Sequence, residues 1–244
     1  MSLPRLLSLP AALALTAVAL LTAGCAAGPG APAPTSSADP SSSASASADG
    51  VVSAFSDIEA VWLDSGRGLA VVTWGSSSCA PEVADVSGGE QRIDITLAGS
   101  AEKACTDDLA PRALYLDVPD GVDVSKDVEL RVAHGARTDH LDLDALAEAP
   151  PARDGQPQAS AGWFEDDGIV LLTWGSSSCA PVVEAVEPDP DGARATFQDA
   201  DGVCTMDFAP RATPIILPDE VERDRRPFTL TLTGGGLDGK VGVE

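Results

Sequence analysis

The chain has 244 residues, and its 38 acidic side chains outnumber its 15 basic ones, which gives a formal net charge of -23. A surface this acidic repels phosphate backbones and therefore disfavours nucleic acid as a partner. A cationic ligand or a metal ion would suit the charge, and solubility alone would also account for it. The length allows one or two domains.

Residues 1–24 have the pattern of a secretory signal. Arg5 provides a positive start, and the apolar run from Leu6 to Leu21 has the length of a signal core but is short for a membrane span. We therefore expect export from the cytoplasm.

The signal ends in the segment Leu21-Thr22-Ala23-Gly24-Cys25. This segment resembles the lipobox of bacterial lipoproteins, although Thr22 stands where that family usually has leucine. The resemblance implies that Cys25 receives a diacylglyceryl group and becomes the N-terminus, which would anchor the chain at the extracytoplasmic face of the cell membrane. The alternative is a plain cleaved signal followed by an incidental cysteine.

Residues 25–56 comprise this cysteine and a segment rich in alanine, serine and proline. Prolines such as Pro29 and Pro40 block helices and sheet ladders, and the low-complexity run from Ser41 to Ser47 cannot bury enough apolar area to order itself. We expect a flexible tether between the membrane and the folded part.

An internal duplication organises the rest of the chain. The segment Thr-Trp-Gly-Ser-Ser-Ser-Cys-Ala-Pro occurs from Thr73 to Pro81 and again from Thr173 to Pro181, and the four tryptophans also fall at matched positions. The two copies either pack together or sit apart on a semi-rigid linker. The expected parts are a repeat domain at 57–147, a linker at 148–161 and a second repeat domain at 162–244.

Both copies are predicted to be all-β, as a small sandwich or barrel. The runs from Leu69 to Trp74 and from Ile169 to Trp174 are continuously apolar and bounded by glycine, as buried strands are. At 138–149 a strand is favoured over a short helix, because the matching segment 240–244 carries two valines and a glycine. Further strands are expected at 92–97, 113–118, 127–133, 194–197, 213–217 and 228–233.

Five cysteines minus Cys25 leave four, two in each copy (5 − 1 = 4). An exported chain favours disulfides, and a duplicated domain should close within itself. We therefore expect one internal disulfide in each repeat domain, Cys79–Cys105 and Cys179–Cys204. A zinc site is the alternative, but two cysteines without a repeated histidine do not supply four ligands.

The three serines of the shared segment invite a nucleophile interpretation, which requires a base such as histidine beside the serine. The only histidines, His134 and His140, both belong to the first copy. Serine hydroxyls that bind loose backbone groups beside a disulfide are the favoured interpretation. No catalytic residue is therefore assigned.

A basic residue recurs in each copy, Arg112 after Asp108 and Arg211 after Asp207. Each pair either forms a local ion pair or presents its arginine to a carboxylate or sulfate ligand, beside a tryptophan that serves as a platform or belongs to the core. The candidate binding residues are therefore Trp74, Ser76, Ser77, Ser78 and Arg112, with their counterparts Trp174, Ser176, Ser177, Ser178 and Arg211.

The segments Asp189 to Gly192 and Asp199 to Gly202 faintly resemble calcium loops, but neither has the EF-hand ligand spacing. Hairpin turns explain them better, so no metal and no cofactor are assigned.

As a whole the chain resembles lipid-anchored surface proteins of actinobacteria that carry Trp-Gly-Ser-Ser-Ser-Cys repeats. That resemblance implies location and anchoring but no activity. We expect a membrane-anchored, non-enzymatic binding or structural module that contacts a cell-envelope or protein ligand. The alternatives are a hydrolase that uses a serine of the first copy and a spacer stiffened by calcium.

Overall fold

A computed structural model of the chain describes residues 58–99, 104–148, 150, 156–224 and 226–244. The expected signal at 1–24, the lipidation site Cys25 and the tether to residue 56 lie outside these residues. The described part is built from strands, and its only helical element is a 3-10 turn, η1 (Asp64–Gly66), which confirms the all-β prediction. It contains no helix with the length and apolarity of a membrane span.

Two sheets pack face to face in the first repeat, so this repeat is a sandwich rather than a barrel. The three-stranded sheet has the order β1 (Glu59–Leu63), β2 (Gly68–Gly75) and β5 (Ala110–Asp117). The four-stranded sheet has the order β3 (Glu82–Gly89), β4 (Arg92–Ala98), β6 (Val128–His134) and β7 (Arg137–Leu143). Strands β4 and β6 are parallel because the chain crosses to β5 in the other sheet between them.

The second repeat has the same topology. Its three-stranded part contains β8 (Ser160–Glu165), β9 (Gly168–Gly175) and β12 (Ala209–Ile216). Its four-stranded part contains β10 (Val183–Asp189), β11 (Gly192–Phe197), β13 (Phe228–Gly234) and β14 (Gly239–Val243). The one difference in pairing is a contact of Val243 with Ala161, which joins β14 to β8 and makes one seven-stranded sheet.

Strand alternation fills each core. In β4, Ile93, Ile95 and Leu97 are buried between the two sheets of the first repeat, while Asp94 and Thr96 point away from that core. The second repeat repeats this arrangement around Phe228 and Leu230 of β13. The expected strands at 92–97 and 228–233 are thereby confirmed.

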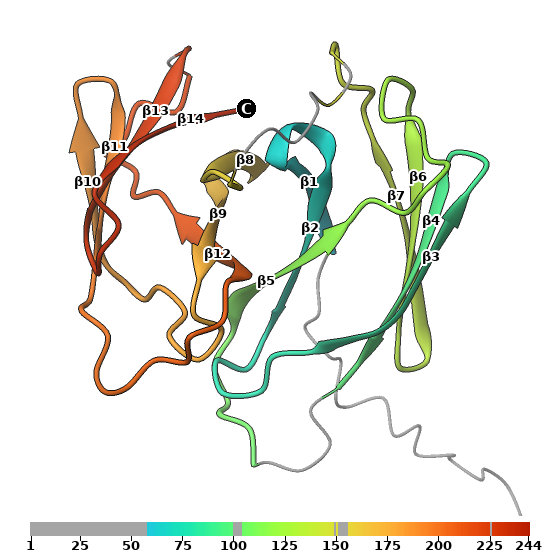
Figure 1. Ribbon diagram of the computed structural model, residues 1–244, viewed down its shortest axis with the longest axis horizontal. Helices are drawn as coiled ribbons and strands as arrows, with labels where there is room; N and C mark the ends of the chain where they lie inside the picture. Colours follow the sequence, from blue (N-terminus) through green and yellow to red (C-terminus); the bar gives the residue numbers. More distant parts are fainter. Residues whose placement is uncertain (1–57, 100–103, 149, 151–155, 225) are drawn as a thin grey trace, which may run out of the picture. The chain divides into compact units, whose positions relative to one another are not determined.

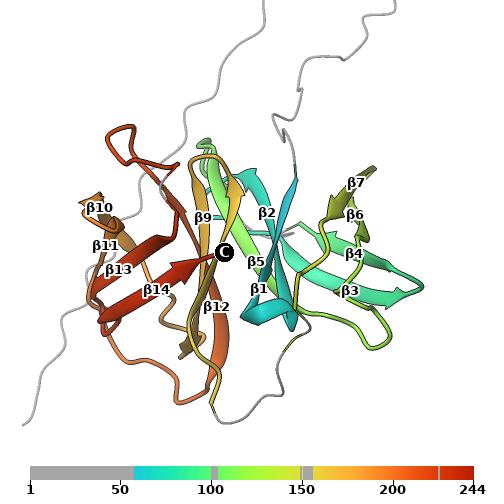
Figure 2. The same ribbon diagram turned by 90° about the horizontal axis from the view of Figure 1, so that it is seen from above.

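The two repeats belong to one compact unit, and they share a third apolar cluster. In β2, Leu69 and Val71 face the core of their own repeat, whereas Ala70 and Val72 face the second repeat, where Leu172 lies in the same cluster. Figures 1 and 2 show the strands β1, β2 and β5 facing β8, β9 and β12. The two repeats therefore pack against each other, which the sequence alone left open.

Close contacts fix this interface. The rings of Tyr115 and Trp174 meet edge to face with centroids 5.8 Å apart. A Cβ at Gly162 would lie 2.5 Å from a methyl of Val61, so β8 approaches β1 where a side chain would not fit. The hydroxyl of Ser160 also accepts a hydrogen bond from the Asp64 amide at 2.9 Å.

The Ala-Pro-Arg segments lie inside strands, which differs from the expected strand starts at 113 and 213. Strand β5 begins at Ala110 and β12 begins at Ala209. Both β5 and β12 are edge strands. A proline, which has no N–H, is tolerated in an edge strand on the side that has no partner strand. Arg112 and Arg211 are therefore strand residues, opposite Thr73 and Thr173.

Candidate functional site

The residues that the sequence singled out gather at one end of each sandwich. Strand β2 ends at Gly75, and the Ser76 to Ser78 turn follows it directly. A disulfide then joins Cys79 to Cys105 with their Cα atoms 5.5 Å apart. The second repeat has the equivalent bond between Cys179 and Cys204 at 5.6 Å, so both predicted pairings are confirmed.

A cluster of hydroxyls stands beside the first disulfide. Ser76 Oγ lies 2.8 Å from Thr106 Oγ1, and the Thr106 amide donates to Ser78 Oγ at 2.9 Å. The Asp108 carboxylate accepts the Ser77 amide at 2.9 Å and the Thr106 hydroxyl. The serines thus bind the neighbouring loop and its backbone, as the structural interpretation of the motif predicts.

The second repeat builds the same cluster with its own residues. Ser176 Oγ lies 2.7 Å from Thr205 Oγ1, and the Thr205 amide donates to Ser178 Oγ at 3.0 Å. Asp207 accepts the Ser177 amide at 3.2 Å and the Thr205 hydroxyl. Since the two copies share these bonds while only one copy has histidines, the cluster does not depend on a histidine.

Hydrogen bonds stabilise the ionised form of the two cluster carboxylates. The Thr106 hydroxyl and the Ser77 amide lower the pKa of Asp108 to about 2. The Ser177 and Thr205 side chains and the Ser177 amide lower the pKa of Asp207 to about 2. Both carboxylates therefore remain ionised at pH values where an ordinary aspartate is protonated.

Replacing both carboxylates, Asp108→Asn with Asp207→Asn, should flatten the dependence of stability on pH between about 4 and about 2. In that window the unfolded chain binds protons that the folded wild type does not bind, so the free energy of unfolding falls as the pH is lowered through it. Urea unfolding at a series of pH values measures the difference. Asp107→Asn, which removes a charge from the same loop, is the control, and a double variant with the wild-type pH dependence would contradict the assignment.

Of the two interpretations of these residues, the local ion pairs Asp108–Arg112 and Asp207–Arg211 are wrong. Arg112 donates from Nε and Nη2 to the carbonyl oxygen of Ser76, at 3.1 and 2.7 Å. Arg211 donates from Nη1 to the carbonyl of Cys179 at 3.0 Å, and burial lowers its pKa. Each aspartate accepts hydrogen bonds within the hydroxyl cluster, and each arginine donates to backbone carbonyls instead.

A pocket of about 260 Å³ lies beside the first disulfide. Its lining combines residues of β2, β5 and β6, which belong to the two sheets of the first repeat, with residues of the adjoining loops. Three predicted binding residues line it, namely Trp74, Ser76 and Arg112. Sequence reasoning did not assign the other lining residues as binding groups: Thr73, Gly75, Cys79, Pro81, Gly99, Cys105 and His134.

Trp74 and Trp174, both candidate binding residues, pack against the interface between the repeats. This agrees with the interpretation of these tryptophans as core residues. Trp174 also stacks on Phe208, with ring centroids 6.0 Å apart, whereas the first repeat has Leu109 at the position of Phe208. Trp74 reaches the pocket at the edge of this cluster. It is therefore both an interface residue and a pocket wall.

The two histidines have different surroundings. His140 lies 3.2 Å from the carboxylate of Glu129 on the neighbouring strand, and it does not line the pocket. His134, at the end of β6, does line the pocket. Strand pairing places His134 beside Leu97. Leu97 is two residues before Gly99, which also lines the pocket.

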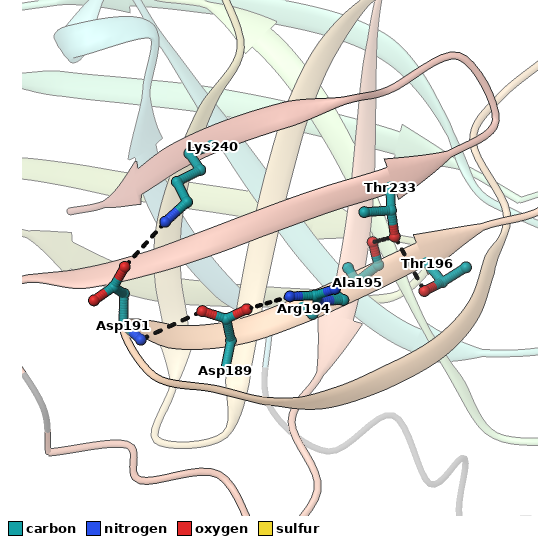
Figure 3. A network of polar contacts seen from close by, with 7 residues as sticks. All are labelled: Asp189, Asp191, Arg194, Ala195, Thr196, Thr233 and Lys240. Carbon is teal, nitrogen blue, oxygen red and sulfur yellow. Dashed lines mark hydrogen bonds and ion pairs between the residues drawn. The ribbon is translucent and has the colours of Figure 1, made fainter.

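The calcium-like segment from Asp189 to Gly192 is the turn of the β10–β11 hairpin. Figure 3 shows its carboxylates paired with basic side chains, Asp189 with Arg194 at 2.8 Å and Asp191 with Lys240 at 3.0 Å. Arg194 lowers the pKa of Asp189 through this hydrogen bond. Within the described ranges, no group of three or more His, Cys, Asp or Glu residues is placed to hold a metal ion.

A larger pocket, of about 780 Å³, lies in the second repeat and contains none of the predicted binding residues. Acidic side chains dominate its lining, and the Arg226 guanidinium carbon lies 5.0 Å from the ring centroid of Trp163. An arginine thus already covers the aromatic face that a cationic ligand would use.

Comparison of the sequence with protein-family models and with curated proteins, and of the fold with solved structures, finds no significant match.

Proposed function

We propose that the chain is a lipoprotein anchored at the extracytoplasmic face of the cell membrane, and that its folded part is a non-enzymatic binding module. The signal pattern of residues 1–24 and the lipobox-like segment before Cys25 support export and anchoring. The two disulfides support an oxidising compartment.

The pocket of the first repeat is the single observation that carries the binding proposal. Its walls include Trp74, Ser76 and Arg112, which the sequence selected as binding residues from the duplication alone. Apolar walls with a few polar groups are typical of small-molecule sites. The Ser76 hydroxyl is held by Thr106 in a cluster that the second repeat also has, which favours binding or structure over nucleophilic attack.

Replacing the anchor cysteine, Cys25→Ala, should move the protein from the membrane fraction to the culture medium. Two acyl chains hold a protein on a bilayer stably, and the described part of the chain offers no spanning helix as a substitute. Fractionation followed by intact-mass measurement of the membrane-bound form tests this expectation. Thr22→Leu, which brings the segment closer to the usual lipobox, should leave the protein in the membrane. A Cys25→Ala protein that remains there would contradict the anchor.

A hydrolase is the second candidate, because Ser76 and His134 line the same pocket. Release of nitrophenolate from p-nitrophenyl butyrate by the purified protein, lost in both Ser76→Ala and His134→Gly, would favour it over the binding proposal. Turnover that survives both substitutions would remove this pair from consideration.

A further inference from the structure

The pocket of the first repeat combines apolar walls with basic groups. The Trp74 ring, Pro81 and the disulfide between Cys79 and Cys105 supply the apolar part. Arg112 adds a guanidinium group to the same lining. A volume of about 260 Å³ is below the range of about 300–1,000 Å³ that is typical of ligand pockets, so the occupant is small.

The charge of Arg112 has no carboxylate bonded to it within the described residues. Its hydrogen bonds go to backbone carbonyls, from Nε and Nη2 to Ser76 and from Nη1 to Pro111 at 3.4 Å. A guanidinium has five N–H donors, so about two remain for another acceptor. In a chain of net charge -23, a cation on a pocket wall that bonds to no carboxylate of the described residues is suited to an anion.

The second repeat uses its equivalent arginine differently. The Arg211 guanidinium lies against Gly175, where a Cβ would be 2.8 Å from its carbon Cζ, and it donates to the carbonyls of Cys179 and Trp174. Its Nε is buried without a hydrogen-bond partner. Gly234 also stands at the position of His134 in the first repeat. Arg211 is thus packed against its own backbone, whereas Arg112 lines a pocket.

We infer that the pocket of the first repeat binds a small organic molecule with an apolar body and one carboxylate group, an inference that rests on the proposed binding function. The apolar body lies against Trp74, Pro81 and the disulfide, and the carboxylate accepts the remaining N–H groups of Arg112. His134 is also part of the pocket lining. The second repeat supports the first through the interface and does not bind this ligand.

Isothermal titration calorimetry of the purified full chain with hexanoate and benzoate tests the inference. Each acid is compared with its neutral amide, and inorganic phosphate is the anion without an apolar body. We expect both carboxylates to bind about tenfold or more tightly than their amides, because a charge-assisted hydrogen bond in a partly enclosed site has that effect. Phosphate should bind more weakly than either carboxylate.

Four variants, at Arg112, Arg131, Gly99 and Arg211, assign the site. Arg112→Gln should weaken carboxylate binding about tenfold or more and leave amide binding unchanged. Arg131→Gln, which removes the same charge from the exposed side of β6, should bind as the wild type does. Gly99→Leu adds a side chain to the pocket lining without a clash, since a Cβ at Gly99 meets no atom within 4 Å, and it should weaken the binding of carboxylates and amides alike. This variant keeps the test valid if Arg112→Gln does not fold.

Each of the following results would contradict one part of this ligand assignment. No heat with either carboxylate, or equal heat with the amides, overturns the ligand class. Equal losses in Arg112→Gln and Arg211→Gln overturn the assignment to the first repeat. If phosphate binds as tightly as the carboxylates, the ligand does not need an apolar body. None of these results bears on the proposed membrane anchor or on the proposed non-enzymatic role. The anchor is tested with Cys25→Ala, and the non-enzymatic role is tested with p-nitrophenyl butyrate.

Discussion

Replacing Leu172 by aspartate should separate the two repeats and split their thermal unfolding. Leu172 is fully buried in the cluster that the repeats share, in contact with no solvent. An ionised carboxylate placed there without a partner loses several kcal/mol of hydration, which is comparable to the whole stability of a small domain. Differential scanning calorimetry should show one transition for the wild type and, for Leu172→Asp, either two transitions or one that is lowered by about 10 °C or more.

A matching variant from the first repeat and an exposed control accompany this experiment. Val72 occupies the equivalent position in the first repeat and is also fully buried in the shared cluster, so Val72→Asp should produce the same separation. Val203 is 99% exposed, so Val203→Asp makes a similar change in composition without touching a core and should leave the transition in place. Wild-type unfolding of Leu172→Asp would mean that the repeats do not pack in solution.

The central interface strands β2 and β9 were predictable from the sequence, but the surface that covers their second face was not. The continuous apolar run from Leu69 to Trp74 correctly indicated a buried strand. Such a run means that both faces of the strand are covered, and it does not say by what. One face meets the core of the same repeat through Leu69 and Val71, and the other meets the second repeat through Ala70 and Val72.

Four strands had no clear sequence signal. Strand β3 (Glu82–Gly89) is an exposed edge strand with a register shift near Val83, so it has no clean alternation of apolar and polar residues. Its counterpart β10 (Val183–Asp189) has the same defect. Strands β1 (Glu59–Leu63) and β8 (Ser160–Glu165) are short, and only the matched tryptophans marked them. Alternation predicts strands with one buried face and fails where both faces are exposed.

Only the pocket residues that recur in both copies of the duplication were predictable. Matching the copies selected Trp74, Ser76 and Arg112, which line one pocket. Gly99 follows β4 and His134 ends β6, and the parallel pairing of these two strands brings both residues to the same end of the sandwich. That pairing depends on a crossover through the other sheet, which local patterns do not encode.

The failed ion pair has a local explanation. Asp108 and Arg112 are close in sequence, but Asp108 precedes β5 and is bound by the Ser77 amide and Thr106. Arg112 lies inside β5, opposite Thr73. The two residues are close in sequence and lie at the same end of the sandwich. Because β5 begins between them, they bind different groups.

Removing either disulfide should cost about 3–4 kcal/mol, because each closes a loop of about 25 residues in the unfolded chain. Cys179→Ser with Cys204→Ser, or Cys79→Ser with Cys105→Ser, should therefore lower the melting temperature by about 10 °C. Both cysteines of a pair are replaced together so that no free thiol remains to form a wrong bond. Thermal unfolding measured by circular dichroism gives the shift for each pair.

Reduction of the wild type separates this effect from any damage by the substitutions. If the bonds act by restricting the unfolded chain, dithiothreitol should lower the wild-type melting temperature and should not change that of a variant lacking all four cysteines of the two disulfides. Digestion of the non-reduced protein should yield Cys79 linked to Cys105 and no link between the repeats. A wild type insensitive to reduction would show that the hydroxyl clusters and the packed interface, rather than the sulfur bonds, hold these loops.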